Sequence, residues 1–117
     1  MLKFSGIVET FEDTEAVGNK KITLKSKQLD IKMQIELPEK ILYFDKEVTD
    51  ELNIIIDDKE IKNESLKILI EGLVYSVVEK ESHVKVLITL AGLPLILELE
   101  PKLNEFKKRS KIFLGMY

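Results

Sequence analysis

The chain contains a single histidine, His83, and no cysteine, so few of its side chains could act as a nucleophile, a base or a soft metal ligand. The lack of cysteine excludes disulfides, zinc fingers and iron–sulfur ligation within this sequence. His83 could serve as a general base oriented by Glu79 or Glu81. No nucleophile or second metal ligand is spaced around it, which favours an ordinary turn histidine.

Two acidic clusters, residues 12–15 and 57–60, could in principle hold a cation. A calcium loop needs oxygen ligands at alternate positions, a glycine at the turn and a closing glutamate, and neither cluster has that spacing. The sequence also lacks a glycine-rich phosphate loop, a Walker lysine and a Gly-x-Ser-x-Gly elbow. We therefore expect no cofactor, no metal site and no small-molecule substrate, and a chain that is not an enzyme by itself.

Basic residues gather in two places. A protein that binds single-stranded nucleic acid would combine such clusters with exposed aromatic rings on which bases stack. The chain is only 7% aromatic, has no tryptophan and carries a formal charge of −3, whereas nucleic-acid binding usually needs a basic surplus. Solvated surface is the favoured interpretation, with nucleic-acid contact by the second cluster as the alternative. The clusters are Lys20, Lys21, Lys25 and Lys27, and then Lys107, Lys108, Arg109 and Lys111.

Length and composition predict one globular domain over residues 1–117. The chain is 44% hydrophobic and 33% charged, which provides both for a core and for solubility. No apolar run reaches the roughly 18 residues of a membrane-spanning helix, and the first residues lack the apolar core of a signal peptide. We therefore expect a soluble, cytoplasmic protein with no membrane partner.

The dominant pattern along the chain has a period of two residues. Residues 28–37 alternate without exception between apolar and polar side chains, as in a strand with one face in a core. Residues 101–108 instead predict a short helical segment, from Pro101 and the spacing of Leu103 and Phe106. About eight strands at regular spacing favour an all-β antiparallel barrel. The other predicted strands are residues 2–12, 21–26, 47–56, 66–80 (bent at Gly72), 83–91, 95–100 and 111–116.

The C-terminal half resembles a known family. Gly72 and Tyr75 match a Gly-x-x-Tyr segment in a long strand, Ala91-Gly92-Leu93 matches a glycine-containing corner, and Lys111 to Met116 matches a hydrophobic last strand. Residues 66–117 thereby resemble the small eighth subunit shared by the eukaryotic nuclear RNA polymerases and its archaeal counterpart. The resemblance implies a barrel with an oligonucleotide-binding-like (OB) motif. It also implies a peripheral, non-catalytic subunit, one copy per complex, docked on the largest polymerase subunit and touching nucleic acid only through that complex.

Two departures from the family pattern, Glu71 for a tyrosine and Ala91 for the first corner glycine, are closer to an archaeal member than to a eukaryotic one. Under the polymerase hypothesis, the apolar corner and the last strand are the candidate interface. The alternative hypothesis is a free-standing OB-type module that binds single-stranded nucleic acid. The candidate interface residues are Gly92, Leu93, Pro94, Phe113, Met116 and Tyr117.

Overall fold

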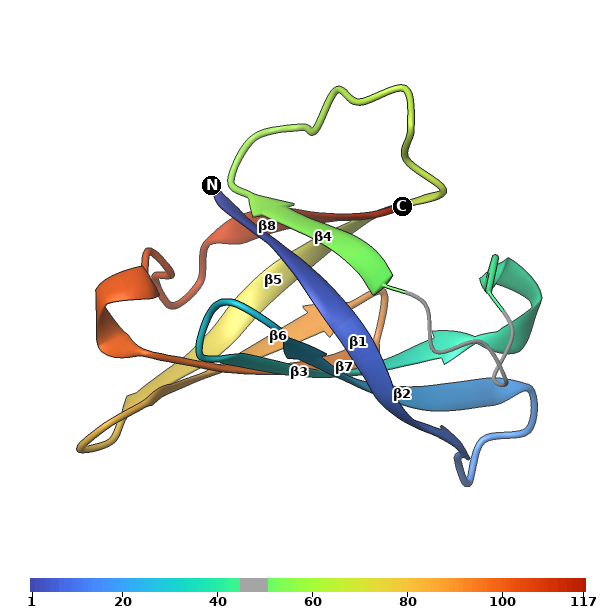
Figure 1. The fold of residues 1–117 in the computed structure, drawn as a ribbon, viewed down its shortest axis with the longest axis horizontal. Helices are drawn as coiled ribbons and strands as arrows, with labels where there is room; N and C mark the ends of the chain where they lie inside the picture. Colours follow the sequence, from blue (N-terminus) through green and yellow to red (C-terminus); the bar gives the residue numbers. More distant parts are fainter. Residues whose placement is uncertain (45–50) are drawn as a thin grey trace.

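The computed structural model describes residues 1–44 and 51–117, which form a closed barrel (Figure 1). The strand order around the barrel is β1-β2-β3-β7-β6-β5-β8-β4, and every pairing is antiparallel. The predicted all-β barrel of about eight strands is thus confirmed. The strands are β1 (Leu2–Asp13), β2 (Asn19–Ser26), β3 (Ile31–Pro38), β4 (Glu51–Asp57), β5 (Ile68–Glu79), β6 (Val84–Leu90), β7 (Leu93–Leu99) and β8 (Lys111–Met116).

Helical structure in the described residues is limited to two short 3-10 turns, η1 (Glu39–Ile41) and η2 (Pro101–Leu103). The helical segment predicted over residues 101–108 is therefore shorter than expected, because the chain leaves the turn at Asn104 in an extended conformation. Leu103 and Phe106 still pack against the core, as their spacing suggested. Residues 47–50 of the strand predicted over 47–56 lie outside the described residues.

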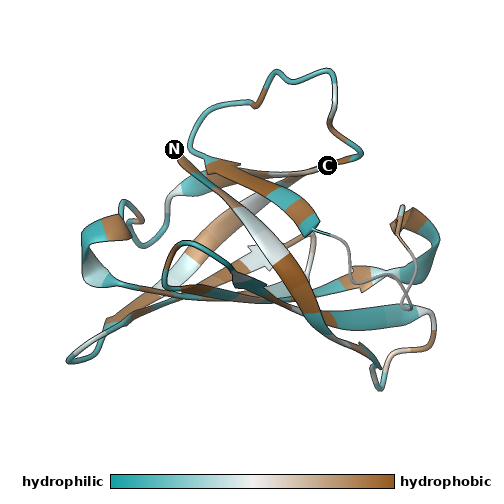
Figure 2. Ribbon diagram, viewed as in Figure 1, coloured by the Kyte–Doolittle hydropathy of each residue, from teal (hydrophilic) through white to brown (hydrophobic). Residues whose placement is uncertain are grey.

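Period-two patterning explains how the strands fill the barrel. In β3, Ile31, Met33, Ile35 and Leu37 are buried, while the residues between them are half-buried or exposed. Figure 2 shows hydrophobic residues concentrated along the strands and hydrophilic residues in the connecting turns. All eight strands contribute inward side chains to one continuous core. The barrel interior is thus packed with aliphatic side chains, as in other small barrels.

Residues 58–67, between β4 and β5, arch over the outer side of β4 and β8 (Figure 1). This loop contacts β8 at Gly115, where a Cβ, if the residue had one, would lie 2.7 Å from Leu66 Cδ2 and 3.3 Å from Ile61 Cδ1. Gly115 therefore allows the loop to lie directly on the sheet. No helix in the described residues has the length and apolar character needed to cross a membrane.

Candidate docking surface

The outer face of β5 carries an unusual concentration of exposed apolar side chains. Leu69, Leu73, Tyr75 and Val78 are 44–45% exposed, and they are four of the seven large hydrophobic residues exposed in the described part of the chain. Isolated exposed apolar residues are normal, but several in one row mark an interaction surface. We call these four residues the β5 face.

Half-buried apolar residues on the neighbouring strands extend the β5 face sideways. On one side, Phe113 of β8 lies opposite Glu71, between the rows of Leu69 and Leu73. On the other side, Leu87 of β6 lies opposite Ser76 and is itself paired with Ile96 of β7. The apolar surface therefore spans four adjacent strands.

A β-bulge in β5 determines which side chains point outward. Val74 pairs with Ile88 and Ser76 with Leu87, so Tyr75 is the extra residue between two pairs. Before the bulge, odd-numbered residues such as Leu69 and Leu73 point outward. The extra residue shifts the alternation by one position, so that the even-numbered Val78 points outward after the bulge. Gly72, the residue at which this strand was predicted to bend, is paired in register with Leu90, and the register shift lies between Val74 and Ser76.

One ion pair lies within this surface. Lys111 Nζ is 2.6 Å from Glu71 Oε1 and 5.6 Å from the centre of the Phe113 ring. Both charged side chains are more than half exposed, so the pair contributes little stability in the isolated chain. The ion pair lies beside the apolar residues of the β5 face. Because Lys111 is paired with Glu71, it is less available to bind a phosphate.

The predicted corner residues lie at the end of the same sheet. Leu90 pairs with Leu93 around a two-residue turn, in which Ala91 has φ 51° and Gly92 φ 88°. Two positive φ values define a primed hairpin turn, so Gly92 serves the turn geometry. Gly92 and Pro94 are exposed and Leu93 is half-buried. Pro94 pairs with Thr89 of β6 and thus adjoins the β5 face.

The last strand contains one residue for which the predicted role is wrong. Met116 is 0% exposed and is paired with Ile54 on one side and Ile68 on the other, so its side chain belongs to the core and cannot contact a partner. Phe113 and Tyr117 are half-buried. The Tyr117 amide donates to the carbonyl of Asn53 at 3.0 Å, which ties the end of the described chain to β4.

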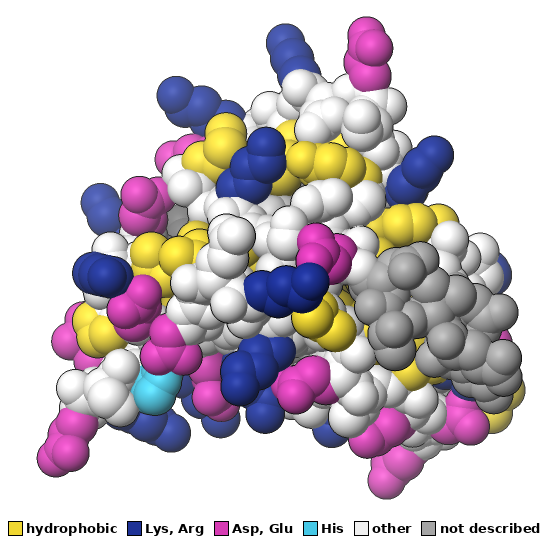
Figure 3. All heavy atoms as spheres, viewed as in Figure 1, with side chains coloured by type: hydrophobic (Ala, Val, Ile, Leu, Met, Phe, Trp, Pro, Cys, Tyr) yellow, Lys and Arg dark blue, Asp and Glu magenta, His cyan; other side chains and the backbone are white. Residues whose placement is uncertain are grey.

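Two basic side chains of the first cluster lie against carboxylates. Lys20 contacts Asp13, and Lys27 contacts Glu51. The hydrogen bond from Lys20 to Asp13 also raises the pKa of the lysine. Figure 3 shows one face of the molecule, on which acidic and basic side chains are interspersed without a continuous basic area. This face lacks the uniform positive stripe that typically tracks a phosphate backbone.

Residues 107–109 are different, and we call Lys107, Lys108 and Arg109 the basic turn. All three are exposed, and none forms an ion pair with a residue that the structure describes. The Arg109 amide donates to the Val74 carbonyl at 2.7 Å, with Arg109 at φ 72°. The basic turn is thereby fixed beside the bulge of β5, at the margin of the β5 face.

His83 has a partner that the sequence did not indicate. Its Nε2 lies 3.2 Å from Asp30 Oδ2, and its Nδ1 lies 2.9 Å from Ser82 Oγ, so its polar partners in the described residues are not Glu79 or Glu81. The side chains of His83 and Asp30 are 43% and 63% exposed. A general base and its nucleophile act in a sheltered cleft with an anion-stabilising group, which this exposed set does not provide. The hydrogen bond between His83 and Asp30 instead links the β5–β6 hairpin to the β2–β3 turn.

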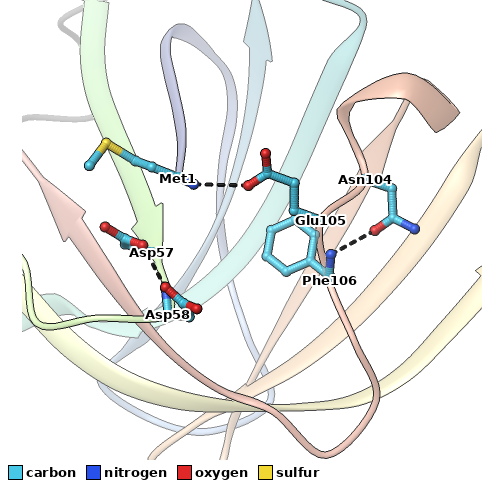
Figure 4. A network of polar contacts seen from close by, with 6 residues as sticks. All are labelled: Met1, Asp57, Asp58, Asn104, Glu105 and Phe106. Atoms are coloured by element: carbon cyan, nitrogen blue, oxygen red, sulfur yellow. Dashed lines mark hydrogen bonds and ion pairs between the residues drawn. The ribbon is translucent and has the colours of Figure 1, made fainter.

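The second acidic cluster borders a pocket of about 290 Å³, whose apolar wall includes Leu2, Ile56 and Phe106. The Met1 ammonium donates to Glu105 Oε2 at 2.9 Å, which raises the pKa of that amine (Figure 4). Asp57 Oδ1 accepts from the amide of Asp58 at 2.8 Å. The described residues contain no group of three or more metal-ligating side chains.

Comparison with known proteins finds a likeness to solved structures but not to family models or curated sequences. No protein-family model and no curated protein sequence matches the chain. Among solved structures, it is similar to the cytoplasmic molybdate-binding protein ModG in a molybdate-bound crystal form. The identity is 12%, the match covers 97% of this chain and 88% of that chain, and the TM-score is 0.40. A likeness of this degree carries no information about what this chain binds.

Proposed function

We propose that the chain is a non-catalytic, peripheral subunit of a multi-subunit DNA-directed RNA polymerase in the cytoplasm, docked in one copy on the largest subunit. The sequence resemblance over residues 66–117 suggests the polymerase. The β5 face is the observation that carries the docking role, because it provides an apolar surface with no covering element among the described residues.

The composition of this surface suits a protein partner. Stable interfaces bury about 800 Å² on each side and place aromatic anchors at an apolar centre with a charged rim. Here Tyr75 and Phe113 supply the aromatic rings, Leu73 lies between them, and the Glu71–Lys111 pair and the basic turn supply charge. The barrel interior is filled by its own side chains, so the outside is the surface that can recognise another molecule.

The test is affinity purification of the tagged chain from its own cells, using two matched variants. Leu73→Glu places a carboxylate in the β5 face, and Val17→Glu places one at a fully exposed apolar residue on the β1–β2 turn. We expect wild type and Val17→Glu to elute with two very large polypeptides at equal stoichiometry, in a fraction that synthesises RNA on a template. Leu73→Glu should remain folded and lose this association.

Two results would contradict the proposal. One is a wild-type chain that elutes alone under gentle conditions, near its own mass of 13.5 kDa. The other is a Leu73→Glu variant that keeps the polymerase association. In the first case, binding of an oligonucleotide across a salt series tests the free-standing module, since that affinity should fall steeply as salt rises.

A further inference from the structure

The distal half of β5 has one edge that is not paired with any strand the structure describes. From Ile68 to Leu73, β5 is paired with β8 on one side, and from Gly72 onward it is paired with β6 on the other. The partner strand β8 begins at Lys111, opposite Leu73, so Ser76–Glu79 are paired with β6 alone. Figure 1 shows the β5–β6 hairpin projecting from the barrel at the lower left.

The backbone hydrogen bonds identify the groups that face this edge. Lys80 donates to the His83 carbonyl at 2.8 Å, so its amide faces β6. Successive residues of a strand direct their backbone groups to opposite edges, which places Ser76 and Val78 toward β6. Val77 and Glu79 must then direct their N–H and C=O groups to the unpaired edge. Val74 precedes the bulge and already exchanges hydrogen bonds with Arg109 and Ser110.

A comparable single-sided segment, at the end of β1, is covered by an aromatic side chain, whereas the β5 edge is not covered in this way by the described residues. β1 continues past its pairing with β4, which ends at Ile7, and is then paired only with β2. On that part of β1, the Phe11 ring packs edge-to-face on Phe44 with centroids 6.0 Å apart. Proteins usually cover or blunt exposed edges because such edges recruit another strand. At the β5 edge, the described residues supply exposed charge, such as that of Glu79, for this purpose.

We infer that an extended, acidic segment of a partner protein adds to β5 as a strand along Ser76–Glu79. The two N–H and two C=O groups of Val77 and Glu79 supply the main-chain pairing, as in other strand-addition complexes. This inference rests on the proposed function, in which the segment belongs to the largest polymerase subunit.

The side chains around the edge define the chemistry of that segment. Tyr75 and Val78 are exposed on its outer side, and Val77 is half-buried against the core on its inner side, so alternate apolar residues of the segment have surfaces to cover. The basic turn is held next to the start of the edge by the Arg109–Val74 hydrogen bond. Its three cations form no ion pair with a described residue, and they favour carboxylates at the neighbouring end of the segment.

The test uses a matched pair of variants at one position. Val77→Pro removes the amide hydrogen at the unpaired edge and leaves the β5–β6 ladder intact, since proline is tolerated where the missing N–H faces away from the partner strand. Val77→Ala removes the side chain and keeps the amide. We expect Val77→Pro to weaken association with the purified polymerase at least tenfold, and Val77→Ala to weaken it by less than threefold.

A second pair keeps the inference testable if proline prevents folding. Lys107→Glu with Lys108→Glu reverses the charge of the basic turn, and Lys25→Glu with Lys32→Glu makes the same change at exposed, facing residues of β2 and β3. The first double variant should weaken the association tenfold, and the second should leave it unchanged. Equal association of both double variants, or of Val77→Pro and wild type, would overturn strand addition while the subunit role stands.

A peptide experiment separates the two proposals if wild type does not bind the polymerase. The isotope-labelled chain is titrated with a synthetic peptide of alternating valine and glutamate, and amide shifts and hydrogen exchange are followed by NMR. Shifts and slowed exchange at Val77, Glu79 and Arg109 would support the acidic strand-binding edge without the polymerase. Peptide-induced shifts at other residues would refute it. Changes at these amides that depend only on the concentration of the chain itself would also refute it, because they would show that a second copy of the chain occupies the edge.

Discussion

Replacing Gly72 by alanine should destabilise the barrel through one close approach between β5 and β6. A Cβ at this position would lie 2.6 Å from Leu90 Cδ2, 2.9 Å from the Thr89 carbonyl oxygen and 3.1 Å from Ile88 Cγ2. The leucine methyl can move by a side-chain rotation. The carbonyl oxygen belongs to the backbone of the paired strand, so relief requires a shift of β6 itself.

The expected cost follows from these contacts. Overpacking a well-filled site costs about 1–3 kcal/mol. The gain from replacing glycine in a strand offsets roughly 0.5–1 kcal/mol of this cost. The free energy of unfolding should therefore fall by about 1–2 kcal/mol. With a urea dependence of about 1.5 kcal/mol per M, the unfolding midpoint should fall by roughly 1 M.

Gly115→Ala is the matched control. Its Cβ would lie 2.7 Å from Leu66 Cδ2 and 3.3 Å from Ile61 Cδ1, which are the far ends of flexible loop side chains. Moving them costs less, so the midpoint of Gly115→Ala should stay within about 0.3 M of wild type. If both variants shift equally, or if Gly72→Ala unfolds at the wild-type midpoint, the distinction between backbone and side-chain obstruction is refuted.

Three further predictions concern the core, a turn and a buried hydroxyl. Met116→Ala should lower the free energy of unfolding by about 2–5 kcal/mol in urea titrations, because the side chain is fully buried. A loss below about 1 kcal/mol would contradict the burial of this side chain. Ala91→Asn should raise the free energy of unfolding by about 0.5–1 kcal/mol, since asparagine tolerates the positive φ of this primed turn better than alanine. The thermal unfolding midpoint should rise accordingly. Burial raises the pKa of Tyr43 from 10 to about 12, and its hydroxyl has no hydrogen-bond partner in the described part of the chain. The unfolded state therefore loses this proton first, so stability should fall from pH 10 to 12, and Tyr43→Phe should fall less steeply while being at least as stable at pH 7.

Strict alternation made much of the barrel predictable from sequence. Residues 28–37 carry one apolar face, and the structure buries Ile31, Met33, Ile35 and Leu37 accordingly. The pattern is less informative where both faces are apolar, because alternation then no longer identifies the inward side. Residues 111–116 are such a case. Phe113 and Met116 were equally plausible as surface residues, and only the register with β4 and β5 places Met116 in the core.

Long-range contacts account for other features that the sequence could not provide. Asp30 lies 53 positions from His83, so no local spacing could pair them. The bulge at Tyr75 is likewise a property of the β5–β6 pairing, and an isolated strand sequence does not specify which residue is left without a partner. The basic turn was visible as a charge cluster, but its position beside β5 depends on the hydrogen bonds between Arg109, Ser110 and Val74.

The composition of β5 itself argues that its outer face is covered in the working protein. Near-continuous apolar runs are typical of strands buried on both faces, whereas a strand with one face in water alternates as β3 does. In β5, the inward residues Val74 and Ile68 are buried, yet Leu69, Leu73 and Tyr75 on the opposite face are 44–45% exposed. The loop of residues 58–67 lies on the adjoining strand β8, with Leu66 and Ile61 beside Gly115. The described residues leave these outer side chains of β5 exposed, and under the proposed function the docked partner would bury them.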